Sequence, residues 1–238
     1  MKKLIYYFLL GMLINSIHLS STKYVEAETR DLNKQDSLIR HIKISEQKIE
    51  NSPIRYPKIS GASNSNAEQK INLTLKQGAE LANNNRLKLI EDEKEAKNKW
   101  NASQGPWRPY EYVFTYKVPY NNLDKLSVIY KEYLYTGGAH GMTVGTTTNF
   151  DVKTGNIVQL SDLINGNTKA VQEYAYQQLQ KKYKGYVLIK SPNEINLDDK
   201  NRLWQFDHAG IKLLFKEYEV AAYAAGMPEA FIPLQVYQ

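Results

Sequence analysis

The chain has 238 residues, of which 42% are hydrophobic and 24% charged, a composition typical of globular proteins. It contains no Cys, which excludes disulfides and thiolate metal sites. The formal net charge is +6, and the charges are interspersed, as in Glu91-Asp92-Glu93-Lys94-Glu95, so the sequence argues against a nucleic-acid-binding protein.

Residues 1–27 have the pattern of a secretory signal peptide. Lys2 and Lys3 precede an apolar run from Leu4 to Ile17 that is short for a membrane span, and Val25-Glu26-Ala27 offers a cleavage site after Ala27. An uncleaved membrane anchor is the alternative. Cleavage removes three lysines and one glutamate and leaves a secreted or cell-wall-associated chain of net charge about +4, with no later segment apolar enough to span a membrane.

Residues 28–37 are polar and are expected to form a disordered linker before a small N-terminal domain over residues 38–105. In this domain, alternating apolar residues from Leu38 to Ile49 indicate a strand, and an extended segment follows up to Gly61. Apolar residues then recur at helical spacing, which predicts one long helix that begins near Asn66 and ends near Lys99.

Residues 106–238 are expected to form a C-terminal domain with an antiparallel sheet. Alternating segments between residues 110 and 160 predict a meander that ends in a short strand from Ile157 to Leu160. A helix over residues 168–183, a hairpin around His208 and a last strand from Ala230 to Val236 follow. Helices and strands are segregated, which predicts an α+β fold: a largely antiparallel sheet with the long helix and a second helix packed on it.

The run Tyr133-Leu134-Tyr135-Thr136-Gly137-Gly138-Ala139-His140-Gly141 joins two predicted strands and is the main candidate for a functional loop. His140 has two interpretations. It could act as an acid or base, or contact a ligand, with Asp162 or Glu219 orienting it. Alternatively it fixes the hairpin by bonding a backbone carbonyl, and we favour this because no nucleophile accompanies it.

Other sites have little support in the sequence. The glycines are not followed by Gly-Lys-Ser/Thr, no Gly-x-Ser-x-Gly is present, and the histidines lack metal-ligand spacing, so we expect no catalytic residue, metal or cofactor. Carboxylates for glycoside hydrolysis are available but unspecific: Asp151, Asp162, Asp207, Glu217 and Glu219. Several aromatic residues could present faces to sugar rings or a protein partner, or fill the sheet core: Trp107, Tyr110, Tyr116, Tyr133, Tyr135 and Trp204.

Two segments together resemble a known bacterial domain. The run from Tyr135 to Gly141, followed by Asn149-Phe150-Asp151 and Lys153-Thr154-Gly155, is similar to an extracellular domain of unknown function. That domain occurs in the ectodomain of the lysozyme-sensing anti-sigma-V factor and in the N-terminal region of PdaC-type peptidoglycan deacetylases. The segment from Tyr218 to Gly226 resembles its end, with Ala222 where we expect a Pro; the residues that mark the family there are Tyr218, Glu219, Tyr223 and Gly226. Tyr56-Pro57-Lys58-Ile59-Ser60-Gly61 and the helix after it resemble the small domain that precedes it.

The resemblance implies a secreted binding module that recognises peptidoglycan or a wall-acting protein such as lysozyme, without catalysis of its own. Its candidate binding loop consists of Tyr133, Tyr135, Thr136, Gly137, Gly138, His140 and Gly141. Counterparts of the anti-sigma segment and of the metal-binding Asp and paired His of the deacetylases are not seen, so deacetylation is not expected. Lysozyme is basic, and a chain of positive charge lacks bulk complementarity to it. The alternatives are a small glycan-active hydrolase that uses His140 with a nearby carboxylate, and a structural envelope protein.

Overall fold

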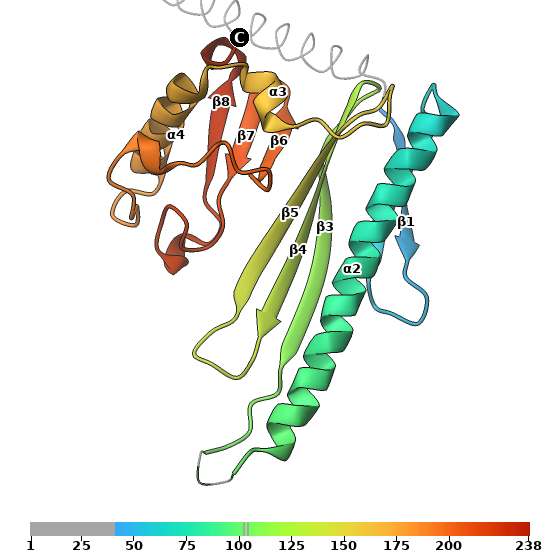
Figure 1. Ribbon diagram of the computed structural model, residues 1–238, viewed down its shortest axis with the longest axis vertical. Helices are drawn as coiled ribbons and strands as arrows, with labels where there is room; N and C mark the ends of the chain where they lie inside the picture. The colour runs from blue at the N-terminus through green and yellow to red at the C-terminus, as the bar shows by residue number, and fades with distance from the viewer. Residues whose placement is uncertain (1–40, 102, 104) are drawn as a thin grey trace, which may run out of the picture. The chain divides into compact units, whose positions relative to one another are not determined.

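The computed structural model describes residues 41–101, 103 and 105–238, and residues 42–238 form one compact unit (Figure 1). The predicted signal peptide and linker lie outside the described residues. Among the residues that are described, no helix is both long and apolar enough to cross a membrane.

The N-terminal part consists of a hairpin and the long helix. β1 (Lys43–Lys48) pairs antiparallel with β2 (Arg55–Ser60). Of the strand expected over residues 38–49, residues 38–40 lie outside the described residues, and residues 41, 42 and 49 are not part of the strand. α2 (Ser65–Asn98) begins at Asn64, whose side chain accepts hydrogen bonds from the backbone of Asn66 and Ala67. The residues that α2 buries recur every three or four positions and therefore lie on one face: Ala67, Ile71, Leu75, Ala79, Ala82 and Leu89.

The meander predicted between residues 110 and 150 is confirmed as a three-stranded antiparallel sheet. It consists of β3 (Glu111–Asn121), β4 (Lys125–Tyr135) and β5 (Met142–Asp151), with β4 in the middle. α2 runs along this sheet (Figure 1), and both contribute to one core that includes Ile71, Leu75, Leu126, Val128 and Phe150. Gly78 permits the close approach, because a Cβ there would lie 2.7 Å from the ring of Tyr130.

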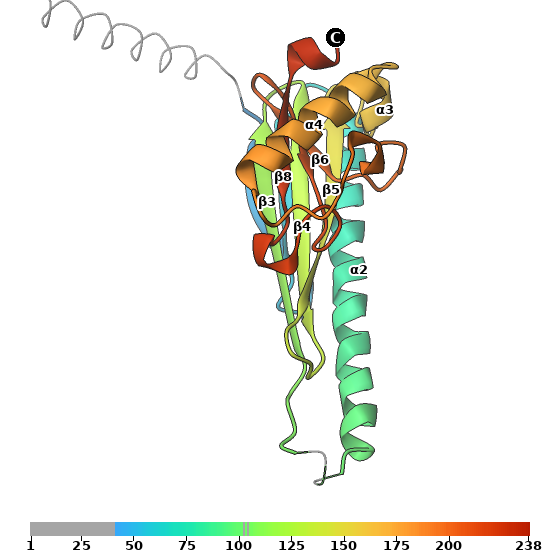
Figure 2. The same ribbon diagram turned by 90° about the vertical axis from the view of Figure 1, so that its left-hand side faces the viewer.

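The C-terminal part contains two helices and a third sheet. α3 (Leu160–Ile164) and α4 (Thr168–Lys182) precede the antiparallel strands β6 (Trp204–Asp207), β7 (Gly210–Leu214) and β8 (Glu229–Pro233). α4 lies beside β8 (Figure 2) and buries Val171, Ala175 and Leu179 in a second core with Phe215 and Ile232. Short 3₁₀ turns are η2 (Pro192–Glu194), η3 (Tyr223–Ala225) and η4 (Leu234–Val236).

The α+β class is confirmed, with the antiparallel strands divided among three sheets. Two strand predictions were wrong in detail. Ile157 forms only an isolated bridge to Phe150, because the chain turns into α3 at Leu160. The last strand ends at Pro233 and is followed by η4, where Tyr237 N donates to Leu234 O. The domain boundary at residues 105/106 stays a prediction, although α2 and the β3–β5 sheet on its two sides share one core.

Candidate functional site

The candidate loop connects β4 to β5 and is fixed by side chains that bond to its backbone. Tyr135 Oη and Arg108 Nη1 both donate to the carbonyl of Gly138, at 3.0 and 3.2 Å. Gly137 has φ +86°, a conformation that favours glycine. Gly141 is buried against Tyr133, whose ring lies 2.4 Å from where a Cβ would be. The loop is therefore a shaped hairpin with an exposed tip.

His140 makes the structural contact that the sequence favoured. Its Nδ1 lies 2.8 Å from the carbonyl of Gly141, and since a carbonyl can only accept, Nδ1 carries the hydrogen. Its Nε2 then accepts from the hydroxyl of Tyr218 at 3.3 Å. The ring stacks on Tyr223 with centroids 4.0 Å apart, and Tyr223 Oη donates to Gly141 O at 3.1 Å. The two segments that carried the family resemblance thus meet at His140.

We name His140, Tyr218 and Tyr223 the aromatic cluster. Tyr218 and Tyr223 stack at 5.6 Å, and Tyr218 is 47% exposed. Tyr218 also has φ +65°, which costs a residue with a Cβ roughly 1 kcal/mol. Gly226, at the end of the same segment, has φ +64° and donates from its backbone N to Tyr223 O. The result is a group of rings presented beside the loop.

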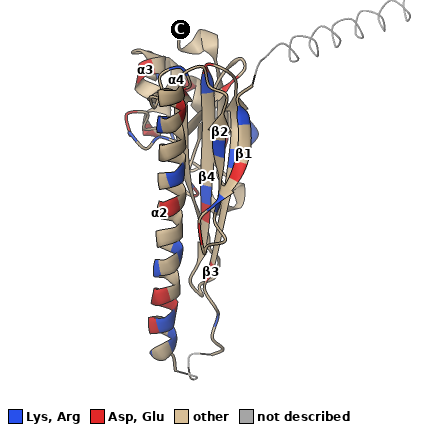
Figure 3. Cartoon of the chain, turned by 90° about the vertical axis from the view of Figure 1, so that its right-hand side faces the viewer, with Lys and Arg blue, Asp and Glu red and all other residues tan. Residues whose placement is uncertain are grey.

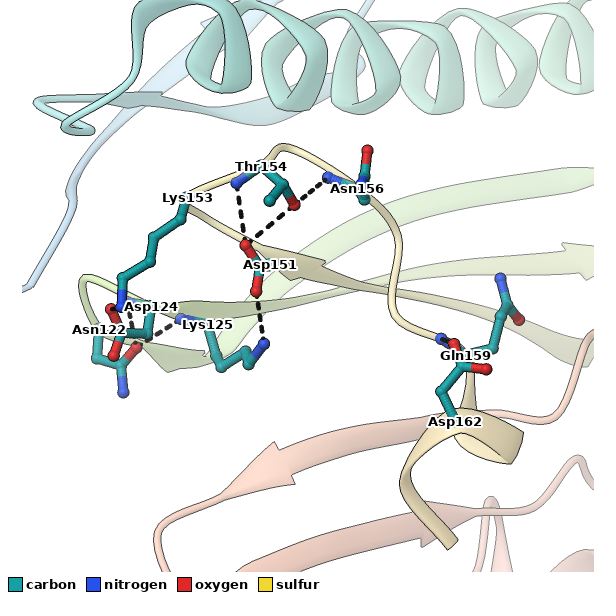
Figure 4. A network of polar contacts seen from close by, with 9 residues as sticks. All are labelled: Asn122, Asp124, Lys125, Asp151, Lys153, Thr154, Asn156, Gln159 and Asp162. Atoms are coloured by element: carbon teal, nitrogen blue, oxygen red, sulfur yellow. Dashed lines mark hydrogen bonds and ion pairs between the residues drawn. The ribbon is translucent and has the colours of Figure 1, made fainter. Parts of the chain in front are cut away.

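The pairing of His140 with Asp162 or Glu219 is not formed. Glu219 accepts from Arg202 Nη2 and from the backbone N of Lys216, the latter at 2.8 Å. Asp162 accepts from the backbone N of Gln159 at 3.3 Å, where α3 begins (Figure 4). These two carboxylates hold backbone segments, and in the described part of the chain none hydrogen-bonds His140.

A second aromatic group lies beside Thr136 and Gly137 of the loop. Trp107 meets Trp100 edge-on at 5.3 Å and stacks on Tyr110 at 5.8 Å. Together with Arg108, Thr136 and Gly137 these rings line a pocket of about 290 Å³, the tryptophan pocket. Sequence reasoning identified Trp107 and Tyr110 and missed Trp100, which directly follows the helix and could have been recognised as the last aromatic residue before the Gly105-Pro106 break.

The other aromatic candidates have structural contacts. Trp204 is 4% exposed and packs edge-on against Phe206, so the core interpretation holds for it. Tyr116 Oη donates to Glu46 at 3.2 Å, between β3 and β1. Within the described residues, no group of three His, Asp or Glu side chains is placed to hold a metal ion.

Asn149-Phe150-Asp151 ends β5, and Lys153-Thr154-Gly155 lies in the turn that follows (Figure 4). This turn contacts the start of α2, where Asn64 donates to Lys153 O. The hydrogen bond from Lys125 Nζ, 2.8 Å long, is the main cause that lowers the pKa of Asp151 from its usual 3.8 to about 2; bonds from Thr154 add to it. A Cβ on Gly155 would lie 2.8 Å from the backbone of Ala67. This part of the family resemblance is therefore structural.

Ala222, where a Pro was expected, also has a physical explanation. Its φ of −60° would suit Pro, but its N–H donates to Tyr186 O at 2.8 Å. A proline here would remove that bond, which joins the segment carrying Tyr223 to the segment after α4.

The comparisons with known proteins agree with this description. Residues 42–143 match the family model "Deacetylase PdaC", and residues 161–235 match the model "Protein of unknown function (DUF3298)". The chain therefore has one segment similar to the PdaC model and one similar to the DUF3298 model, named here the PdaC segment and the DUF3298 segment, which confirms the resemblance inferred from its motifs. No curated protein matches the chain. His140 falls in the first matched segment and Tyr218 in the second, so the aromatic cluster joins the two.

Two crystal structures of the DUF3298 family are similar to the chain. A member from Bacteroides fragilis is 17% identical with a TM-score of 0.53, over 83% of this chain and 91% of that one. A member from Pseudomonas aeruginosa is 16% identical with a TM-score of 0.49, over 83% and 92%. The first shows that the fold is shared.

Proposed function

We propose that the chain is a secreted, cell-envelope-associated binding module that recognises the glycan of peptidoglycan without catalysis of its own. The observation that supports this most is the tryptophan pocket beside the candidate loop. Its rings offer flat apolar faces for the C–H faces of a sugar, and Arg108, Thr136 and the loop backbone offer polar groups for hydroxyls. A volume of about 290 Å³ suits one or two sugar rings.

Secretion is part of the proposal and rests on the signal-peptide pattern of residues 1–27. The resemblance to PdaC-type peptidoglycan deacetylases supports a ligand from the cell envelope. Binding is favoured over hydrolysis because both ring nitrogens of His140 are already engaged, by Gly141 and Tyr218. Among the described residues no carboxylate hydrogen-bonds this ring, whereas a glycosidase works with a pair of carboxyl groups.

A wall-acting protein such as lysozyme is the second candidate, and one observation speaks to it. The C-terminal end of α2, beside the tryptophan pocket, carries Glu91, Asp92, Glu93 and Glu95. Figure 3 shows acidic and basic residues alternating along this end, and Lys88–Asp92 and Lys99–Glu95 are ion pairs. Because these lysines offset the acidic charge, we favour the glycan over a basic protein.

The test is a pull-down of purified residues 28–238, which include the whole compact unit, with insoluble peptidoglycan and separately with immobilised lysozyme. The Trp107→Ala/Tyr110→Ala variant removes two faces of the pocket. Tyr186→Ala is the matched control, because Tyr186 is 50% exposed and does not line the pocket. Circular dichroism establishes that each variant folds.

We expect the chain and the control to sediment with peptidoglycan and the pocket variant to lose about tenfold in affinity. Retention on lysozyme alone at low salt would support the second candidate. Failure to bind either ligand, or equal binding by the pocket variant, would contradict the proposal. Release of soluble sugar during the incubation would support the hydrolase instead.

A further inference from the structure

Two adjoining hollows of about 380 and 430 Å³ lie apart from the tryptophan pocket, and the first of them lies beside β5. Both are lined by Gln159, Lys200, Arg202 and Trp204. The first is also lined by β5 from Val144 to Asn149 and by Lys216, and we name it the Arg202 hollow.

Arg202 is buried with incomplete hydrogen bonding. Its side chain is 3% exposed, Nη2 donates to Glu219, and the guanidinium lies 5.2 Å from the ring centre of Phe215. Nε and Nη1 are buried and have no hydrogen-bond partner among the described residues. Unpaired buried donors on a charged group are costly, so an oxygen acceptor that reached Nε or Nη1 would be favoured.

The charge of the hollow is unbalanced. Lys200, Arg202 and Lys216 line it, and no Asp or Glu is among its lining residues. Glu219 offsets Arg202, whereas neither lysine forms an ion pair with any carboxylate in the part of the chain that the structure describes. Asp198 and Asp199 line only the second hollow. A ligand with carboxylates therefore fits the first hollow better than the second.

β5 offers backbone hydrogen-bonding groups to the same hollow. It is the outer strand of its sheet, so one side of its backbone has no pairing strand. On that side Thr143 N donates to Glu217, and Asn149 O accepts from Val158 N. Since alternate residues of an antiparallel strand direct their backbone groups the same way, Gly145 and Thr147 present theirs to this edge. An extended peptide could pair with them.

We propose that the Arg202 hollow binds a short peptide with free carboxylates, which pairs with the edge of β5 at Gly145 and Thr147. Its carboxylates contact Lys200 and Lys216, and an oxygen that reaches Arg202 satisfies the unpaired guanidinium donors. The site shares no residue with the tryptophan pocket, so it can fail or succeed independently of glycan binding.

The test uses two synthetic peptides, acetyl-Glu-Val-Glu-amide and acetyl-Gln-Val-Gln-amide, titrated into residues 28–238 at low salt by calorimetry. Arg202 is left intact because its loss endangers folding. The Lys200→Gln/Lys216→Gln variant removes the rim charges. Lys169→Gln/Lys184→Gln removes the same charge from exposed lysines outside the hollow.

We expect the glutamate peptide to bind about tenfold more tightly than the glutamine peptide. The rim variant loses that difference and the control variant retains it. Amide exchange at Gly145 and Thr147 slows on adding the glutamate peptide. Absence of binding, equal weakening in both lysine variants, or unchanged exchange at β5 would each overturn the proposal.

Discussion

Gly141 occupies a position where no side chain fits. A Cβ there would lie 2.4 Å from Tyr133 Cζ and 2.6 Å from the backbone oxygen of Leu134. The ring of Tyr133 can move, but the carbonyl belongs to a paired strand and cannot without breaking the register of β4 with β5. The carbonyl oxygen of Gly141 itself accepts hydrogen bonds from His140 and Tyr223. A shift of the Gly141 backbone would therefore disturb the aromatic cluster.

We therefore expect Gly141→Ala to lower the free energy of unfolding by about 1–3 kcal/mol. Gly138→Ala is the matched control, because the nearest atom to its Cβ would be 3.9 Å away and its φ is not in the left-handed region. Urea unfolding of the two variants measures the difference, and similar losses in both would show that the space at Gly141 is not decisive.

The contacts of Glu219 show what residue types alone do not reveal. It was one of two carboxylates that the sequence offered to orient His140, yet it pairs with Arg202, 17 residues earlier in the chain. A carboxylate can form an ion pair with any cation that the fold brings close to it. The sequence between Arg202 and Glu219 has no periodicity that predicts an ion pair between these two residues. The contact of His140 with a backbone carbonyl, by contrast, agrees with the interpretation that the sequence favoured.

Among the elements, the turn from Asp151 to Asn156 links the β3–β5 sheet to the first turn of α2. Asp151 accepts from Lys125, from Thr154 N and from Thr154 Oγ1 (Figure 4). Asn64, the N-cap of α2, donates to Lys153 O. Hydrogen bonds to its ionised form lower the pKa of Asp151 to about 2. Its contribution to stability is therefore present above the unfolded pKa of about 3.9 and is lost as pH falls from about 4 to about 2.

We expect Asp151→Asn to lower the melting temperature at pH 7 and to reduce the loss of stability between pH 4 and pH 2, so that wild type and variant converge at the acidic end. Asp198→Asn is the control, since Asp198 is exposed and forms no ion pair with the described residues. Thermal melts at several pH values measure this. A constant difference between wild type and Asp151→Asn at all pH values would contradict the linkage.

The elements differed in how far they could be predicted. α2 was predictable because apolar residues such as Ala67, Ile71 and Leu75 recur at helical spacing along it. Its central asparagines do not interrupt the helix, since the side chains of Asn83 and Asn85 hydrogen-bond to Ser52 and Glu132 outside it. The ends of short elements were not. Residues from Ile157 to Leu160 are apolar enough for a strand, but only long-range contacts decide that one bridge forms and α3 follows.

At the scale of the compact unit, a buried polar network joins the β3–β5 sheet to the β6–β8 sheet. Ser127 Oγ donates to Asn149 Oδ1 at 2.6 Å and accepts from Phe206 N at 2.9 Å. Asn149 Nδ2 donates to Trp204 O at 2.9 Å. Ser127 and Asn149 are 0% and 2% exposed. These contacts lie between the PdaC and DUF3298 segments, and with the aromatic cluster they connect the two segments at both ends of β5. Sequence patterns cannot place such a network, because its members lie 22 to 79 residues apart.

Asn149→Ala tests whether this network makes the two segments one cooperative unit. The substitution leaves the carbonyl of Trp204 without its donor and the hydroxyl of Ser127 without its acceptor, so we expect a loss of about 2–3 kcal/mol in the free energy of unfolding. The wild-type chain should unfold in one transition, seen alike by tryptophan fluorescence and circular dichroism. Asn193→Ala, at an exposed position in η2, is the control and should stay within about 0.5 kcal/mol of wild type. Two separate transitions in the wild type, or a small effect of Asn149→Ala, would mean that the segments are stable independently and that ligand binding on one has no means of reaching the other through β5.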